Sequence, residues 1–219
     1  MQRFINIHTH SVQKDGALHI VNIAEDYGQC TNFDACSIGI HPWYLPSDGI
    51  GQQLNDLTRY AVNKEVFAIG ECGLDKLCNT AWFLQEDVFL KQIAIANQVN
   101  KPLIIHCVKA YSEVVQCLQK MANNVPVIFH GFNKKASVAQ TLIEKGYYLS
   151  FGHSIIAQQN LESLKICPPS QLFLETDDTE QEIEAVYEKA ANVLEIPIDK
   201  LVKQLQTNFD RIKKKTIKQ

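Results

Sequence analysis

Apolar residues in this sequence gather into short runs that are often rich in β-branched side chains. The runs occupy residues 4–8, 17–23, 35–40, 66–72, 102–107, 125–131, 147–152 and 171–177. Each has about the length of a strand, and most are apolar throughout rather than alternating with polar residues. That pattern is typical of strands buried on both faces, as in a parallel sheet.

Segments with helical periodicity separate most of the later runs. In residues 52–64, for example, Leu54 and Leu57 fall on roughly one face. Further helical stretches are residues 83–99, 110–122, 134–145, 155–165, 179–193 and 198–215. Strands that alternate with helices predict right-handed βαβ units, and eight strands suggest a closed barrel.

The first third of the chain departs from a regular barrel. The connections 9–16 and 24–34 are too short and too polar for full helices. We therefore expect an α/β fold, a compact and distorted TIM (β/α)8 barrel with reduced helices between its first strands. A barrel of this type normally takes ~250 residues, so 219 residues would make a small one.

Composition narrows the classes of protein that remain. No linker, repeat or low-complexity tract divides the chain, so one domain over residues 1–219 is expected. The formal charge of −3 argues against a protein that coats nucleic acid. No apolar run approaches the ~18 residues of a membrane helix. The N-terminus turns polar too early for a secretory signal, so a cytoplasmic location without membrane contact is expected.

The seven cysteines do not predict a metal or disulfide framework. Their number is odd, and no pair has the C-x-x-C spacing. Cys72 and Cys107 each follow a candidate site residue, and strand alternation turns them away from it. We expect the cysteines to be reduced packing residues.

Side chains suited to metal binding and acid–base chemistry end these apolar runs or follow them directly. They are His8, His10, His41, Glu71, His106, His130 and Asp177. Barrel enzymes build their sites at the carboxyl ends of the strands. His8 and His10 are two residues apart, so an extended strand points both toward one divalent metal. His19 lies within a run with no evident partner, and we interpret it as a buried core histidine.

Several motifs in order along the chain carry a family resemblance. They are INIHTH (5–10), GIHPW (39–43), IGECGLD (69–75), Gln85, Phe89 and IAIA (93–96), KPLIIHC (101–107), FHGF (129–132), YYLSFG (147–152), LFLETD (172–177) and TNFDRI (207–212). With these motifs the sequence resembles the TatD family of metal-dependent hydrolases, within the amidohydrolase-like barrels. The match spans nearly the whole chain.

The resemblance implies a centre with two divalent metal ions. The implied ligands are His8, His10 and Asp177 at the first metal, His106 and His130 at the second, and Glu71 bridging both. This mixture of imidazole and carboxylate suits Zn²⁺, Mn²⁺ or Mg²⁺ alike. Two such ions can activate water and clamp the oxygens of a displaced ester. Asp177, as general base, and Glu71 are the expected catalytic residues.

Other residues near the strand ends are expected to meet the substrate. The resemblance favours His41 as a residue that orients a phosphate, and Asp75 as a support for the metal ligands. Lys76 and Lys109, with Lys134 and Lys135, follow three of the strands and would attract an anionic substrate. An equally weighted alternative is that these four lysines are ordinary solvated side chains without a role in substrate binding.

Two aromatic residues of the same loops are interpreted differently. Aromatic side chains at the rim of a site can stack on a base. We expect Trp43 to lie at the rim and Phe132 to lie in the core.

The chain departs from its relatives in positions that would contact substrate. The arginine that many relatives carry after the fifth strand is absent from residues 106–110, and Lys76 stands where relatives often have tyrosine. The loop after Asp177 is also shortened. These departures leave every implied metal ligand in place, so they bear on the substrate rather than on metal binding.

Three hypotheses of function follow. The first is a two-metal phosphodiesterase, a TatD-like deoxyribonuclease that uses a metal-activated water on DNA or another phosphodiester. The alternative is a metal-dependent hydrolase of an ester or amide, either a small molecule or a tRNA-linked one. The third is a metal-binding or interaction protein without enzymatic activity. No obligate protein partner is evident from the sequence.

Overall fold

The computed structural model describes residues 3–11, 15–45 and 48–217. Its internal contacts divide the chain into two units. Unit 1 comprises Met1–Val21 and Ile128–Lys214, and unit 2 comprises Asn22–Val127 and Lys215–Gln219. The prediction of one domain over residues 1–219 stays a prediction.

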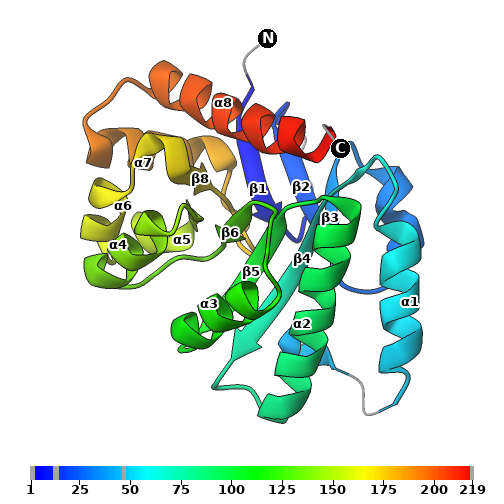
Figure 1. Cartoon of the computed structure of the whole chain (residues 1–219). Coiled ribbons are helices and arrows are strands. Elements are labelled where there is room, and N and C mark those ends of the chain that lie inside the picture. Colours follow the sequence, from blue (N-terminus) through cyan, green and yellow to red (C-terminus); the bar gives the residue numbers. More distant parts are fainter. Residues whose placement is uncertain (1–2, 12–14, 46–47, 218–219) are drawn as a thin grey trace. The chain divides into compact units, whose positions relative to one another are not determined.

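Each predicted apolar run contains or overlaps a strand (Figure 1). The strands are β1 (Ile5–Thr9), β2 (Leu18–Ile23), β3 (Cys36–Ile38), β4 (Val66–Asp75), β5 (Leu103–Val108), β6 (Val127–Phe129), β7 (Tyr148–Phe151) and β8 (Leu172–Leu174). The unit boundaries fall inside β2 and β6. Most strand residues are buried, as the continuous apolar runs predict.

In unit 1 the strands pair in parallel. β1 pairs with β2, β6 with β7, and β7 with β8. A further parallel bridge joins Thr9 to Asp177 beyond the end of β8. Its hydrogen bonds run from His10 N to Asp177 O (3.0 Å) and from Asp177 N to His8 O (3.1 Å). This bridge sets the backbone register between two of the predicted site segments.

In unit 2, β4 pairs in parallel with both β3 and β5. All ten residues of β4 are buried, so it is a central strand of this unit. Gly73 lies opposite His106 with φ of 147°. A Cβ atom on Gly73 would lie 2.0 Å from the carbonyl oxygen of His106. The glycine therefore permits β4 and β5 to approach where both carry site residues.

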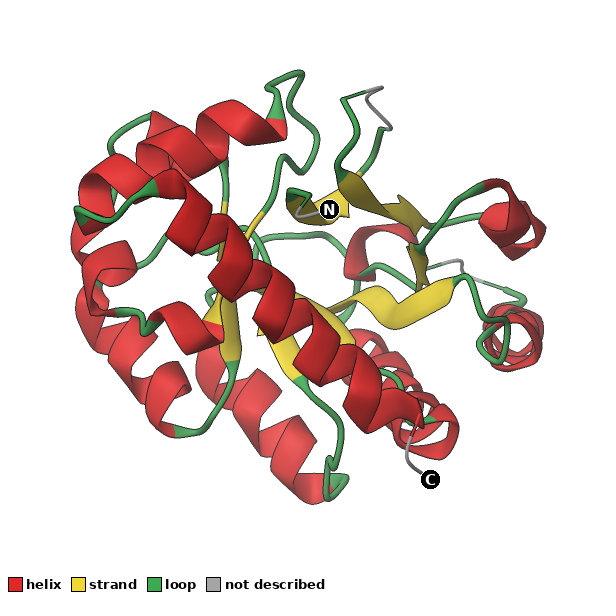
Figure 2. Cartoon of the chain, turned by 90° about the horizontal axis from the view of Figure 1, so that it is seen from above, coloured by secondary structure: helices red, strands yellow, loops and turns green. Residues whose placement is uncertain are grey.

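The helices are shown in red in Figure 2. The α-helices are α1 (Ile50–Tyr60), α2 (Trp82–Val99), α3 (Tyr111–Lys120), α4 (Ala136–Glu144), α5 (His153–Ile156), α6 (Leu161–Ile166), α7 (Ile183–Leu194) and α8 (Ile198–Ile217). Short 3₁₀ helices are η1 (Tyr27–Asn32), η2 (Pro42–Tyr44) and η3 (Pro169–Gln171). The stretch predicted as one helix over residues 155–165 forms two short helices, α5 and α6.

The reduced connections of the first third are confirmed. Among the described residues between β1 and β2 there is no helix, and only η1 separates β2 from β3. None of the helices in the described ranges combines the length and apolar character that a bilayer crossing requires.

Helices of unit 1 are tied to its strands by buried polar bonds. Tyr187 of α7 donates its hydroxyl hydrogen to Ile5 O at 3.0 Å, and the same hydroxyl oxygen accepts a bond from Ile5 N at 3.1 Å. Figure 1 shows α8 lying across the amino-terminal end of β1. Asn208 of α8, fully buried, donates to Leu172 O at 2.9 Å, where β8 begins. These bonds hold the helices in register with the strands that carry site residues.

The cysteines behave as their spacing predicts. All seven are free, and five are buried. Burial raises the pKa of Cys36 to about 12 and also raises the pKa of Cys72 and Cys167. These thiols are therefore neutral packing groups at pH 7.

Gly73→Ala is expected to lower the free energy of unfolding by about 2–4 kcal/mol, because the added methyl group meets backbone. Gly51→Ala is the matched control, since nothing lies within 4 Å of its new Cβ in α1. The control should gain up to ~1 kcal/mol from helix propensity. Urea unfolding monitored by circular dichroism measures both. Equal stability of the two variants would contradict the close approach of β4 and β5.

Candidate metal centre

The first cluster lies in unit 1, at the carboxyl end of β1 and beyond β8. His8 Nε2 lies 3.4 Å from Asp177 Oδ1, and His10 Nε2 lies 3.5 Å from the same oxygen. His8 is fully buried, whereas the side chain of His10 is 44% exposed. The predicted convergence of two imidazoles on one side of the strand is therefore observed, and a carboxylate oxygen faces both.

The two histidines also determine the charge of Asp177. Burial by itself raises the pKa of this carboxyl group, because it penalises the anion. Hydrogen bonds from His10 and His8 outweigh that effect and hold the pKa well below its usual range. Asp177 is consequently an anion at neutral pH, the form that binds a metal or accepts a proton.

A second carboxylate, Glu175, completes the polar cluster of unit 1. His130 Nδ1 lies 3.5 Å from Glu175 Oε1, and the His130 and His8 rings are 4.3 Å apart. Glu175 Oε1 accepts a hydrogen bond from Gly131 N at 2.6 Å. Glu175 is 1% exposed, and its Oε2 has no hydrogen-bond partner among the described residues. Such a buried oxygen is costly unless a ligand or cation meets it.

Glu175 was not predicted from the sequence. The available signal was its spacing, because Glu175 precedes Asp177 by two residues, as His8 precedes His10. A period of two near a strand end places side chains on the same side.

The second cluster lies in unit 2, around Glu71 of β4. His41 Nε2 donates to Glu71 Oε1 at 3.1 Å, and His106 Nδ1 lies 2.9 Å from the same oxygen. Trp43 N donates to His41 Nδ1, which puts the proton of the neutral ring on Nε2. Asn22 Oδ1 accepts a bond from Glu71 N at 2.9 Å and fixes the backbone there. His41 therefore contacts a predicted metal ligand directly.

Asp75 holds the opposite side of His106. Asp75 Oδ2 accepts hydrogen bonds from His106 Nε2 (3.0 Å) and Trp43 Nε1 (2.6 Å), and Oδ1 accepts one from Leu77 N (2.7 Å). Burial raises the pKa of Asp75, but the bonds from His106 and Trp43 outweigh it and lower the pKa overall. A carboxylate on the far nitrogen is the usual support of a metal-binding histidine. The expected supporting role of Asp75 agrees with these bonds.

Other predicted residues lie at the same end of the strands. Lys76 is paired with Glu113 of α3, and Lys109 is exposed at the end of β5. Phe132 is buried and Trp43 is 53% exposed, as expected. His19 is buried, as expected, and both its ring nitrogens have partners, Asn6 Nδ2 at 3.1 Å and Asp15 Oδ1 at 2.8 Å.

The donor sets fit a divalent metal. In unit 1, candidate donor atoms lie within 4.8 Å of one another in the trios His8–His10–Asp177 and His130–Glu175–Asp177. In unit 2 the corresponding trio is His41–Glu71–His106. Imidazole and carboxylate together suit Zn²⁺ and Mn²⁺, and the buried Glu175 Oε2 supplies an oxygen that a cation would satisfy. The individual ligand and catalytic assignments stay predictions.

Asp75→Asn is expected to weaken Mn²⁺ or Zn²⁺ binding by about 10–100-fold, since His106 loses the carboxylate that orients it. Asp87→Asn is the matched control, because Asp87 pairs with Lys91 on the exposed face of α2. Isothermal titration calorimetry measures the affinities. Unchanged affinity in Asp75→Asn would contradict a metal-supporting role.

Glu175→Gln is expected to change stability in opposite directions with and without metal. In the metal-free protein the substitution replaces a buried charged oxygen without a partner by an uncharged amide and keeps an acceptor for Gly131 N, so the Tm should rise or stay constant. The rise in Tm on adding Mn²⁺ should become smaller.

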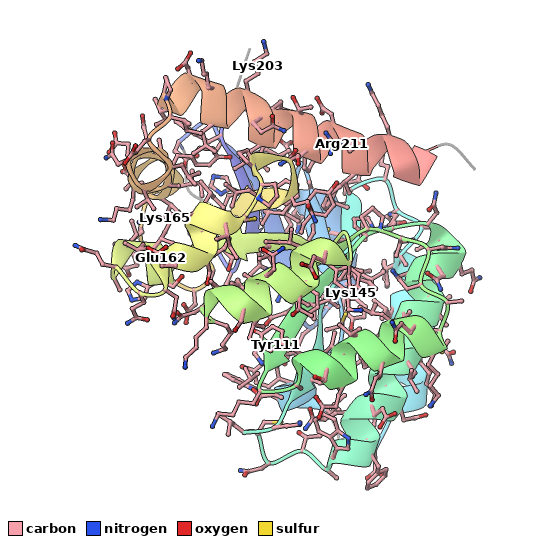
Figure 3. All side chains as sticks on the ribbon, turned by 60° about the vertical axis from the view of Figure 1, so that its left-hand side comes forward. Tyr111, Lys145, Glu162, Lys165, Lys203 and Arg211 are labelled. Atoms are coloured by element: carbon pink, nitrogen blue, oxygen red, sulfur yellow. The ribbon has the colours of Figure 1, made fainter. Side chains whose placement is uncertain are left out.

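Glu162→Gln is the control for this pair of measurements. Glu162 bonds Lys165 at 3.0 Å on α6, and both are labelled in Figure 3. This variant should keep the full metal-induced rise in Tm. A full rise in Glu175→Gln as well would exclude Glu175 from the metal cluster.

Comparison with known proteins agrees with the geometry. The family described as "TatD related DNase" matches residues 1–214. The chain is 36% identical over 154 residues to the uncharacterized metal-dependent hydrolase YabD of Bacillus subtilis, covering 67% of this chain and 59% of YabD. It is 28% identical over 175 residues to the 3'-5' ssDNA/RNA exonuclease TatD of Pantoea ananatis, covering 77% of this chain and 65% of that protein. The chain thus spans less than two thirds of these relatives.

Solved structures show the same fold. The TatD homologue YJJV of Escherichia coli K12 matches with a TM-score of 0.84 at 20% identity, over 96% of this chain and 98% of that one. A hydrolase TatD family protein of Entamoeba histolytica matches with a TM-score of 0.81 at 15% identity, over 96% and 98%. This likeness confirms the expected α/β fold of the TIM barrel type. The chain belongs to the TatD family of metal-dependent hydrolases.

Proposed function

We propose that this protein is a two-metal phosphodiesterase that hydrolyses single-stranded nucleic acid, a deoxyribonuclease of the TatD type. The observation that carries the proposal is the gathering of imidazoles around carboxylates at the carboxyl ends of the strands, in both units. Divalent ions held there would lower the pKa of water toward ~7 and polarise a phosphoryl oxygen. The relative from P. ananatis is named as an exonuclease of ssDNA and RNA, which supports this substrate class.

Asp177 is the proposed general base. Its pKa is held low by two imidazoles, so the carboxylate is anionic, and it is one of three donors that face one point. Side chains that are already oriented by neighbours need little rearrangement during the reaction. In this proposal Asp177 takes a proton from the attacking water.

Glu71 is the second proposed catalytic residue. His41 Nε2 donates to one of its oxygens, His106 Nδ1 lies 2.9 Å from the same oxygen, and Asn22 fixes its backbone, so three segments of the chain position Glu71. His41 donates its Nε2 hydrogen to the same oxygen, and in the proposal it turns this hydrogen to a substrate phosphate when the Glu71 oxygen binds a metal. Lys109, exposed at the end of β5, would supply positive charge for the phosphate backbone.

Glu71→Gln is expected to reduce cleavage of single-stranded DNA by at least about a thousandfold, because it removes a charge worth several kcal/mol from the proposed two-metal site. The wild-type protein should degrade the DNA with Mn²⁺ or Mg²⁺ and lose activity with a chelator. Fluorescent gel assays with 5'-labelled oligonucleotides measure the rates.

Glu65→Gln is the matched control, because Glu65 precedes the opposite end of β4 and pairs with Lys64. Its rate should equal that of the wild type. The proposal fails if the wild type cleaves no phosphodiester with any of the divalent metals.

A second candidate function has a specific observation in its favour. Only residues 178–182 separate Asp177 from α7, and this short connection leaves little chain to contact a polynucleotide. The same metal residues would then hydrolyse an ester or amide of a small or tRNA-linked molecule. One enzyme preparation tested on ester, amide and phosphodiester substrates distinguishes the two functions.

A further inference from the structure

Two adjacent hollows lie in unit 2 beside the carboxyl end of β4. One encloses about 440 Å³ and includes Trp82, Gln85 and Glu113 in its lining. The other encloses about 330 Å³ and includes Trp43 and Leu77. Their linings share Asp75, Cys78 and Thr80. Volumes of this size are typical of small-ligand sites.

We propose that these hollows bind unpaired nucleobases of a single-stranded nucleic acid. The inference rests on the proposed function and adds a location for the base next to the metal cluster. It assigns base binding to the segment between β4 and α2, residues 76–81.

Each hollow is lined by one indole ring. Trp43 is 53% exposed, although its Nε1 is fixed by the 2.6 Å bond to Asp75. Trp82 is half-buried at the start of α2, with the Lys76 ammonium 5.6 Å from its ring centroid. Aromatic rings that are held in place but remain accessible are suited to stacking on bases, whichever base is present.

The charges of the hollow favour a base over a phosphate. Asp75 and Glu113 contribute two carboxylates, and Lys76 contributes one ammonium group that is paired with Glu113. A phosphate would therefore be repelled, whereas an uncharged planar ring would not. The Thr80 hydroxyl and the Asn79 amide also line the cavities and offer hydrogen bonds to the edge of a base.

The walls of the hollow are held in position by hydrogen bonds. Gln85 accepts a bond from Asp75 N at 2.9 Å and donates to the carbonyl oxygens of Asp75 (3.1 Å) and Thr80 (2.8 Å). Gln85 is 2% exposed, so its buried amide group holds residues 75–80 in position. A braced site loses little conformational entropy when a ligand binds.

Asp75 connects the hollows to the metal cluster. Its Oδ2 bonds both Trp43 Nε1 and His106 Nε2, and His106 in turn contacts Glu71. A base on Trp43 would therefore lie one side chain, Asp75, away from the histidine that faces Glu71, and a base on Trp82 would lie in the hollow that Asp75 also lines. The phosphodiester attached to that base would reach the cluster, so binding of the base would position the bond for hydrolysis.

The test compares two fluorescein-labelled deoxyoligonucleotides of the same length, one with all bases and one with three abasic residues at its 3' end. Binding is measured by anisotropy in a chelator and cleavage is measured in Mn²⁺. The wild type should bind the intact strand about tenfold more tightly than the abasic strand, the size expected for stacking.

Trp82→Ala should reduce this preference, because one of the two indole platforms is lost, and should leave affinity for the abasic strand unchanged. Trp82→Phe should retain most of the preference. Phe83→Ala is the matched control, because Phe83 is a neighbouring aromatic residue, 74% exposed, that lines neither hollow. The control should keep the wild-type preference.

The inference is overturned if the wild type binds both strands equally, or if Trp82→Ala weakens both to the same degree. Cleavage without base preference would leave the proposed function intact and reject the hollow. A base preference in binding without any cleavage would reject the proposed hydrolytic function and support the hollows as base-binding sites.

Discussion

The site depends on one constraint, which is the cost of burying carboxylates. An anion removed from water is strongly disfavoured unless hydrogen bonds or opposite charges replace its hydration. In unit 1 two imidazoles face the carboxylate of Asp177, and in unit 2 two imidazoles face that of Glu71. At Asp177 the histidines lower the pKa and keep the carboxylate charged. In both units the backbone must hold each strand end where the contacts between imidazole and carboxylate form.

Much of this arrangement could be predicted because parallel strands have a simple sequence signature. Continuous apolar runs identified all eight strands, since both faces of such strands are covered. Ligand-type residues at the ends of the runs indicated His8 and Asp177, which lie together in unit 1, and Glu71, which lies in the cluster of unit 2. Their roles as ligands stay predictions. The Thr9–Asp177 bridge gives the physical reason why segments so far apart in sequence share one cluster.

What could not be predicted depended on side-chain contacts between distant segments. Glu175 lies in an apolar run, and only the fold shows its carboxylate between Gly131 N and His130. The contact of His41 with Glu71 likewise depends on how residues after β3 turn toward β4. The partners of His19 were missed because Asp15 comes from the connection before β2. Hydrophobic periodicity carries no information on such polar contacts.

The arrangement around Asp75 shows how one carboxylate can serve two purposes. Three donors satisfy it, so it remains anionic while its field orients His106. The same bond to Trp43 holds its exposed indole beside the hollow. Without this bond the side chain would be free to rotate away. Positioning of the proposed metal ligand and of the proposed base platform therefore rests on one group. Any change at Asp75 must alter both together, whereas a change at Trp82 alters only the platform.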